Sequence, residues 1–178
     1  MSKRVAIYGA IIAVLLIGSA ADYSREIFAV FWHLRHGSHA EVRGIRFPVP
    51  LEYEVLESPG LPRLTMVRVA GHAWHGGGVI DIDFHKQPSP EFVRLLQSRG
   101  LMKSQVVGEQ IATLAGKPGK CVEGIPETGD AQLQKIIRDR DFLEIDCWFG
   151  GEVEVTLRGT ANLKNDFYSV IYGAVRSR

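Results

Sequence analysis

The first residues of the chain combine a short basic segment with a long uncharged one. Lys3 and Arg4 precede the segment from Val5 to Ala21, which has 17 residues and no charged side chain. As a helix rising about 1.5 Å per residue, this segment would be roughly 25 Å long, the short end of what crosses the hydrocarbon core of a bilayer. The sequence therefore predicts a membrane-targeting helix ahead of the rest of the chain.

Two interpretations of this segment are open. A cleaved secretory signal peptide has the same basic start and apolar middle, followed by small residues such as Gly18, Ser19, Ala20 and Ala21. An uncleaved single-pass anchor is favoured, because apolar and aromatic residues resume at helical spacing in Ile27, Phe28, Val30, Phe31, Trp32 and Leu34. On the anchor interpretation, the residues predicted to contact the membrane are Ile7, Ile11, Leu15, Phe28, Phe31 and Trp32.

Positive charge on the two flanks of this segment predicts its orientation. Lys3, Arg4 and the amino terminus indicate that the N-terminus stays in the cytoplasm. Arg25, Arg35 and Arg43 on the other flank argue for the reverse, but long domains are translocated largely regardless of charge. We therefore expect a protein of the cytoplasmic (inner) membrane whose C-terminal domain is periplasmic.

The rest of the chain divides into a linker and one domain. We expect a transmembrane and juxtamembrane helix over residues 1–36, a linker over 37–44, and an exported α+β domain over 45–178. Within the domain, apolar residues mostly alternate with polar ones, which is typical of β-strands. Strands are predicted at residues 45–49, 53–56, 64–69, 79–85, 106–114, 120–122, 142–149 and 152–158.

Two helices are predicted to pack against the sheet. The first begins at Ser89-Pro90-Glu91, where a capping serine precedes proline, and ends at Arg99-Gly100. Residues 127–134 are expected to form a polar loop with weak helical tendency, and residues 135–141 a solvated edge or turn. The second helix begins near Asn162, and one side of it carries Leu163, Phe167, Val170, Ile171, Ala174 and Val175.

The order of these elements resembles that of PsbP-like proteins. Short connections, including the Gly150-Gly151 turn of a hairpin, predict a largely antiparallel sheet. The resemblance covers roughly residues 43–178 and rests on the proline-flanked opening strands, Gly116-Lys117-Pro118-Gly119 before a strand, and the closing helix. Proteins of this fold include extrinsic photosystem subunits and small exported bacterial proteins. The resemblance implies an accessory or binding role and assigns no functional residue.

Two groups of polar residues are candidates for chemistry. His33 and His36 are three residues apart on a predicted helix and could share a metal ion, or could form a polar patch at the membrane surface. Asp81, Asp83 and His85 alternate along one strand, so they share a face on which they could bind a divalent cation or act as acid and base. The same alternation is expected of any strand with one side in solvent.

The two cysteines lie in predicted strands. Cys121 and Cys147 are 26 positions apart and would be exported to a compartment in which disulfides form. A disulfide between them and a pair of buried thiols are both compatible with the sequence.

Composition narrows the class of function. With 21 Lys+Arg against 20 Asp+Glu, the net charge of +1 lacks the basic excess of a nucleic-acid-binding protein. A hydrophobic content of 46% is that of a folded domain rather than a disordered chain. No motif points to an activated nucleophile, and no cofactor is predicted.

We therefore expect a non-enzymatic, single-pass, membrane-anchored accessory or binding subunit. Its partners would be the lipid bilayer and other proteins of a larger membrane complex, redox and photosynthetic complexes included. The alternative is an exported metal-binding protein or small enzyme that uses Asp81, Asp83 and His85.

Overall fold

A computed structural model describes residues 28–56, 61–68, 77–85 and 104–177. The segment predicted to enter the membrane, with Ile7, Ile11 and Leu15, lies outside these residues, and so does the helix predicted from Ser89. Within the described ranges, no helix combines the length and the apolar character needed to span a bilayer.

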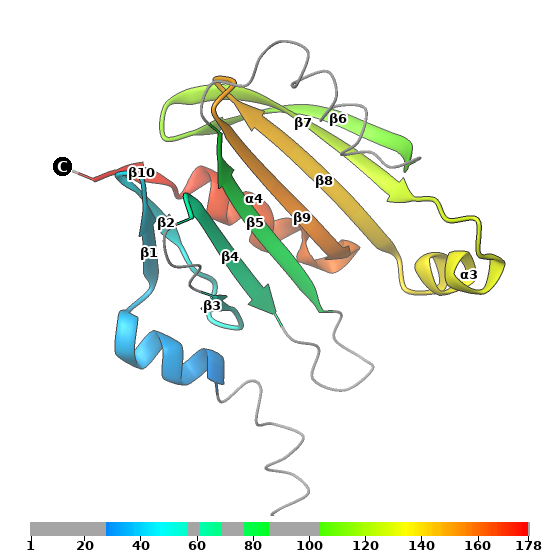
Figure 1. The fold of residues 1–178 in the computed structure, drawn as a ribbon, viewed down its shortest axis with the longest axis horizontal. Coiled ribbons are helices and arrows are strands. Elements are labelled where there is room, and N and C mark those ends of the chain that lie inside the picture. The colour runs from blue at the N-terminus through cyan, green and yellow to red at the C-terminus, as the bar shows by residue number, and fades with distance from the viewer. Residues whose placement is uncertain (1–27, 57–60, 69–76, 86–103, 178) are drawn as a thin grey trace, which may run out of the picture.

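The described residues form two antiparallel sheets (Figure 1). The strands of the large sheet are β3 (Glu54–Leu56), β4 (Arg63–Arg68), β5 (Gly78–Phe84), β6 (Ser104–Leu114), β7 (Lys117–Pro126), β8 (Phe142–Phe149) and β9 (Val153–Thr160). They lie in the order β3-β4-β5-β9-β8-β7-β6. The small sheet has the order β1-β2-β10, with β1 (His39–Val42), β2 (Ile45–Pro48) and β10 (Val175–Arg176). The predicted α+β fold with a largely antiparallel sheet is confirmed.

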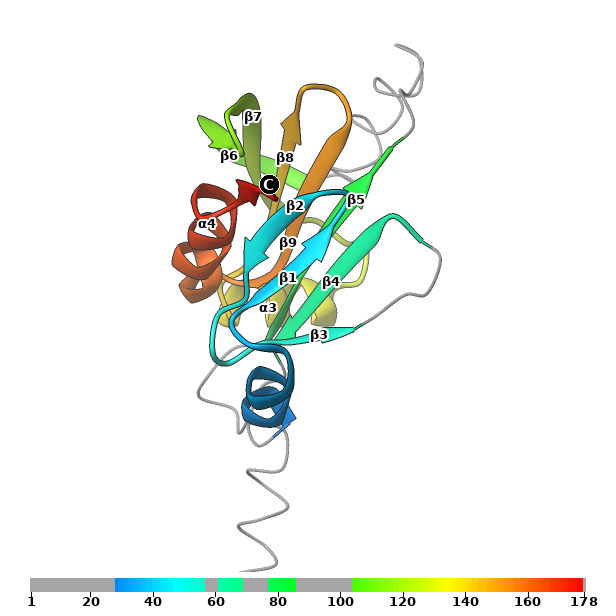
Figure 2. The ribbon, with the colours of Figure 1, turned by 90° about the vertical axis from the view of Figure 1, so that its left-hand side faces the viewer.

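The closing helix joins the two sheets. A 3-10 turn, η1 (Ala161–Leu163), leads into α4 (Lys164–Tyr172), which contacts β2 of the small sheet and β6 and β9 of the large one (Figure 2). Leu163, Phe167, Val170 and Ile171 are fully buried, as predicted from their helical spacing. Val175 differs from the prediction, because it lies in β10 and is half-exposed.

The hydrophobic core lies on the side of the large sheet that faces α4. Alternate residues of the central strands point into it, and they are fully or almost fully buried: Ile80, Ile82, Ile145, Val153, Val155 and Leu157. This period-two pattern, read correctly from the sequence for β5, β8 and β9, fixes which side chains point the other way.

Residues 39–42, expected to be part of a linker, form strand β1 instead. They pair with β2 through a two-residue turn, in which Arg43 and Gly44 have φ of 53° and 70°. Two positive φ values are the signature of the hairpin turn that matches the twist of its strands. The strand was missed because four residues alternating between exposed and half-buried side chains make only a short pattern.

Residues 127–141 contain a helix that the sequence analysis did not predict. In α3 (Ala131–Asp139), the side chain of Asp130 caps the N-terminus and accepts hydrogen bonds from the amides of Gln132 (2.8 Å) and Leu133 (3.1 Å). No residue of α3 is buried. Because the helix has no core-facing stripe, its alternating charges suggested a solvated turn, and the capping aspartate was the signal that could have revealed it.

Candidate functional site

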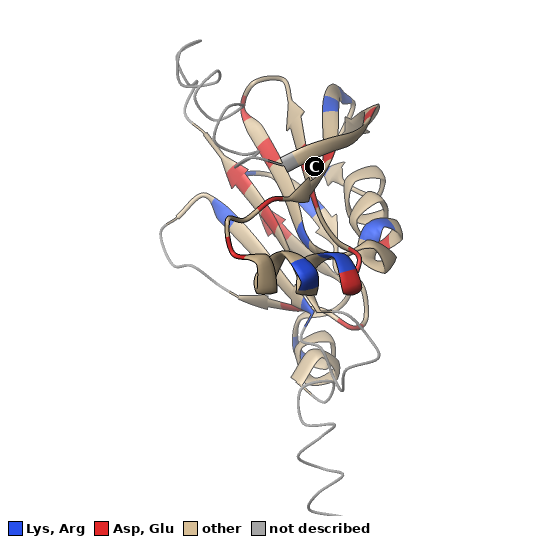
Figure 3. Cartoon of the chain, turned by 90° about the vertical axis from the view of Figure 1, so that its right-hand side faces the viewer, with Lys and Arg blue, Asp and Glu red and all other residues tan. Residues whose placement is uncertain are grey.

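The polar side chains of the large sheet gather on the side opposite the core, which we call the outer face. Strand register brings them into rows that cross the central strands, so residues far apart in sequence become neighbours. One row consists of Arg63, Asp83, Glu154 and Trp148. The adjacent row consists of Thr65, Asp81, Thr156 and Asp146. Figure 3 shows acidic positions running across neighbouring strands of this sheet.

Asp81 is buried within the outer face rather than exposed to solvent. It is 7% exposed, and its Oδ1 accepts a hydrogen bond from the Thr65 hydroxyl at 2.7 Å. The guanidinium of Arg63 lies 2.8 Å from the same oxygen and 3.4 Å from Asp83 Oδ1. The expectation that this side of the strand simply faces solvent is therefore wrong for Asp81, because partners on β4 cover it.

His85 follows the last residue of β5 and pairs with an acidic residue of β9. Its Nε2 lies 2.9 Å from Glu154 Oε2, and its ring stacks on Trp148 with the ring centroids 5.6 Å apart. Burial raises the pKa of Glu154, an effect that the neighbouring His85 partly offsets. Burial likewise raises the pKa of Asp83, and the positive charge of Arg63 offsets part of that rise.

A second pair of acids lies on β8. Glu144 is bound by Arg158 through an Nε–Oε1 contact of 2.7 Å, and Asp146 is 6% exposed. Burial, with the nearby negative charge of Glu144, raises the pKa of Asp146 to about 6. Its Oδ1 is buried without a hydrogen-bond partner. A hydrogen bond from Thr156 and the charge of Arg158 offset the rise in pKa only in part.

The predicted trio does not converge on one point. Asp81 and Asp83 share Arg63, whereas His85 binds Glu154. Within the described ranges, no three His, Cys, Asp or Glu side chains are grouped so that they could hold a metal ion. The sequence analysis missed the other members of the network, although the same alternation that singled out β5 also places Glu144, Asp146 and Glu154 on the outer face.

The two candidate histidines near the N-terminus have structural contacts. His33 places Nδ1 3.0 Å from the carbonyl oxygen of Gly37 and Nε2 3.0 Å from that of Pro50. His36 lies with Nδ1 3.0 Å from the carbonyl oxygen of Trp32 and stacks on the Trp32 ring. The His33 ring thus links the end of the helix to the start of the domain, whereas His36 contacts Trp32 within the same helix.

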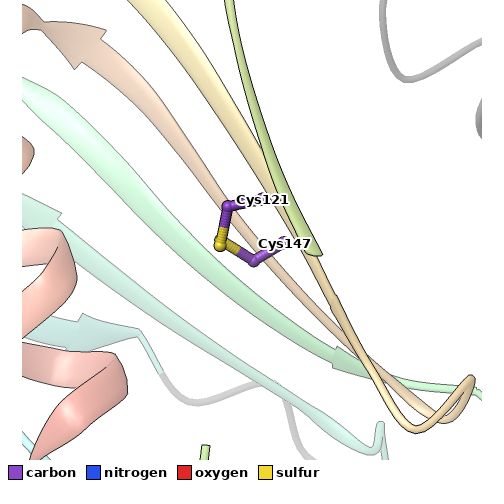
Figure 4. The surroundings of a disulfide bond; sticks show 2 residues. All are labelled: Cys121 and Cys147. Atoms are coloured by element: carbon purple, nitrogen blue, oxygen red, sulfur yellow. A yellow bond between two sulfur atoms is a disulfide. The ribbon is translucent and has the colours of Figure 1, made fainter. Parts of the chain in front are cut away.

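Cys121 and Cys147 form a disulfide, so of the two possibilities left by the sequence the structure has the bridge (Figure 4). The two residues are directly paired on the neighbouring strands β7 and β8 and are 1% and 0% exposed. The disulfide is therefore part of the core.

Comparison with known proteins gives a resemblance to solved structures. No family model matches the chain, and no curated protein matches it. The chain resembles PsbP. The similarity is to the solution structure of cyanobacterial PsbP (CyanoP) from Synechocystis sp. PCC 6803, with a TM-score of 0.44 and 13% sequence identity. It covers 75% of this chain and 86% of that one. The PsbP-like resemblance predicted from the order of elements is confirmed.

Arg63→Ala is expected to lower the free energy of unfolding by about 1–2 kcal/mol, because it leaves the buried Asp81 with only the Thr65 hydroxyl as a partner. The value is below that of a fully buried pair, since the Arg63 side chain is 39% exposed. Urea unfolding of the full-length chain measures the change. Arg46→Ala, at an exposed position of β2, is the matched control and should change stability by less than about 0.5 kcal/mol. Equal effects of the two substitutions would contradict the role given to Arg63.

Proposed function

We propose that the chain is a non-enzymatic accessory subunit that is anchored in the cytoplasmic membrane through residues 1–36. Its folded domain would lie on the periplasmic side of that membrane. The apolar segment and its flanking charges motivate the anchor and its orientation. The described residues add support at three places: the helix that follows the segment, the disulfide, and the outer face.

The observation that carries the proposal is the two-sided character of the helix over residues 28–36. Ala29 is buried and Trp32 packs against the core, so this side faces the domain. Phe28, Phe31 and Leu34 are 61%, 63% and 78% exposed on the other side. Phe28 lies seven residues beyond Ala21, where the apolar segment ends, and aromatic and aliphatic side chains at this place suit the boundary between membrane and water. Figure 1 places this helix, in blue, at one end of the domain.

These contacts change one detail of the predicted membrane contacts. Phe28 and Phe31 are exposed, which is compatible with the membrane contact proposed for them. Trp32 instead lies between the helix and the domain, stacked on His36 with the ring centroids 5.0 Å apart. The proposed membrane contacts of this helix are therefore Phe28 and Phe31, with Leu34 in place of Trp32.

The disulfide supports the location of the domain on the periplasmic side of the membrane. Structural disulfides persist in oxidising compartments and are rare in the cytoplasm. Cys121 and Cys147 lie in the core, where no catalytic exchange partner can reach them without unfolding.

The outer face supports the non-enzymatic part of the proposal. Asp81, Asp83 and His85 each have an oppositely charged or hydrogen-bonding neighbour, as expected of a network that stabilises a sheet.

Strand β6 exposes aliphatic side chains: Val106, Val107 and Ile111 are about half or more exposed. Exposed aliphatic residues on one strand favour a protein partner over a small substrate.

The test of the anchor uses a fluorescent label on the helix. The full-length Phe31→Cys variant is labelled with an environment-sensitive fluorophore and reconstituted in vesicles. Lipids that carry a quencher should quench the fluorescence of this label. The control label at Arg138→Cys, on the exposed helix α3, should not be quenched. Equal quenching at both positions, or a native protein that begins near Ala21 and washes off membranes in carbonate, would refute the anchor.

The orientation and the accessory role need two further measurements. In spheroplasts, a tag after Arg178 should be removed by added protease, whereas a protected tag would mean the reverse orientation. Extracted in mild detergent from its native membrane, the protein should migrate as a stoichiometric complex. A monomer that retains the fold would argue against an accessory subunit.

A further inference from the structure

A cleft of about 400 Å³ lies where the two sheets meet. It borders the turn between β1 and β2, at the end of β1 that is away from the helix over residues 28–36. Its apolar lining consists of Ile45, Phe84 and Val153. Its polar lining consists of Arg43, Arg176, Lys117, Glu152 and His85. The cleft therefore combines an apolar surface with cationic side chains from three separate parts of the chain: the β1–β2 turn, β7 and β10.

The charges of the cleft do not balance. Lys117 Nζ is paired with Glu152 Oε2 at 2.6 Å. Among the described residues, Arg43 and Arg176 have no ion pair, so two guanidinium groups are left to bind a ligand. The pKa of Glu152 is lowered chiefly by Lys117 and also by Arg176, so the Arg176 charge acts within the cleft. Three cations face one carboxylate.

Arg43 is held at the cleft by an unusual backbone conformation. It is the first central residue of the β1–β2 turn, with φ of 53°, a position at which glycine and asparagine are favoured. Arg176 belongs to β10 and pairs with Ile45, next to the turn. The Ser177 amide then donates to the Gly44 carbonyl at 2.9 Å, which fixes the end of β10 against the same turn. The turn and β10 therefore bring Arg43 and Arg176 to the same cleft.

From this geometry we propose that the cleft binds a small organic anion, with a carboxylate or phosphate held by Arg43 and Arg176 and an apolar body against Phe84 and Ile45. The guanidinium fork matches both oxyanions, and two free arginines can hold one such group from two sides. The volume lies within the range of small-molecule sites, and the lining offers both an apolar surface and charged groups that can orient a ligand. This inference is independent of the membrane anchor and of any protein partner.

The test is a binding titration of the full-length chain with benzoate, phenyl phosphate and inorganic phosphate. We expect at least one of the two aromatic anions to bind ten-fold or more tightly than inorganic phosphate, because only they reach the apolar surface. Arg43→Gly should weaken that binding at least ten-fold without loss of the fold, since glycine suits the turn. Arg176→Ala should weaken it similarly, and Arg138→Ala on α3 should leave it unchanged.

Four results would overturn the proposal. The first two concern the ligands: neither aromatic anion binds, or inorganic phosphate binds as tightly as the better aromatic anion. The other two concern the variants: Arg138→Ala and Arg43→Gly weaken binding equally, or Arg43→Gly binds as tightly as wild type. Loss of a protein partner in Arg43→Gly, with no competition by the aromatic anions, would overturn it in favour of an acidic segment of that partner.

Discussion

Removing the Cys121–Cys147 disulfide is expected to lower the free energy of unfolding by about 3.5 kcal/mol. The bridge closes a loop between residues 26 positions apart, and the loop-closure entropy it removes from the unfolded chain corresponds to about that value. The comparison is between oxidised wild type and wild type unfolded and refolded in reductant, by urea titration of the full-length chain in mild detergent. This comparison leaves both sulfur atoms in the core, so it isolates the cross-link from packing.

A double variant provides the control for this measurement. Cys121→Ala with Cys147→Ala should be insensitive to reductant, and it should be less stable than reduced wild type by the cost of two small cavities. If oxidised and reduced wild type unfold at the same urea concentration, the bridge contributes no stability, and its support for an oxidising compartment is lost with it.

Asp146→Asn is expected to raise the free energy of unfolding at pH 8 by up to about 3 kcal/mol. The pKa of Asp146 is raised from 3.8 to about 6 in the folded protein, and each unit corresponds to about 1.4 kcal/mol. The folded state therefore binds a proton more tightly than the unfolded state, and wild type loses stability as the pH rises from about 4 to 6. The amide keeps the shape of the carboxyl group and removes the charge that Glu144 repels.

The pH dependence distinguishes this effect from a general change in surface charge. The difference in stability between Asp146→Asn and wild type should be small at pH 4 and should reach its full value above pH 6. Glu127→Gln, at an exposed position, should shift stability by less than about 0.5 kcal/mol at either pH. A variant less stable than wild type at pH 8 would mean that the Thr156 hydrogen bond and the Arg158 charge outweigh the cost of burying the Asp146 charge.

The sheet could be predicted from sequence where one side of a strand is buried and the other is polar. The alternation of Ile80 and Ile82 with Asp81 and Asp83 gave both the strand and its inward side. The same reasoning worked for the β8–β9 hairpin, whose Gly150 and Gly151 have φ of 59° and 71°. The local alternation was sufficient to predict these strands because burial of one side of a strand requires an apolar residue at every second position.

The polar network could not be predicted in the same way. Burial of Asp81 depends on Arg63 and Thr65, and the position of His85 depends on Glu154, which is 69 residues away in sequence. A single strand carries no information about which strands become its neighbours. The period-two pattern therefore identifies an outward-pointing side chain, but only the strand order decides whether neighbouring side chains cover it.

The strand order also determines when this chain can fold during its synthesis. Strand β9 lies between β5 and β8, so β5 has no neighbour on that side until residue 160 has been made. Strands β6 to β8 are paired in sequence order and can assemble as they are made, whereas β5 must wait for β9, about 75 residues later in the chain. Until then β5 lacks a neighbour on that side, and a chaperone or the export machinery would find that edge of the sheet unpaired.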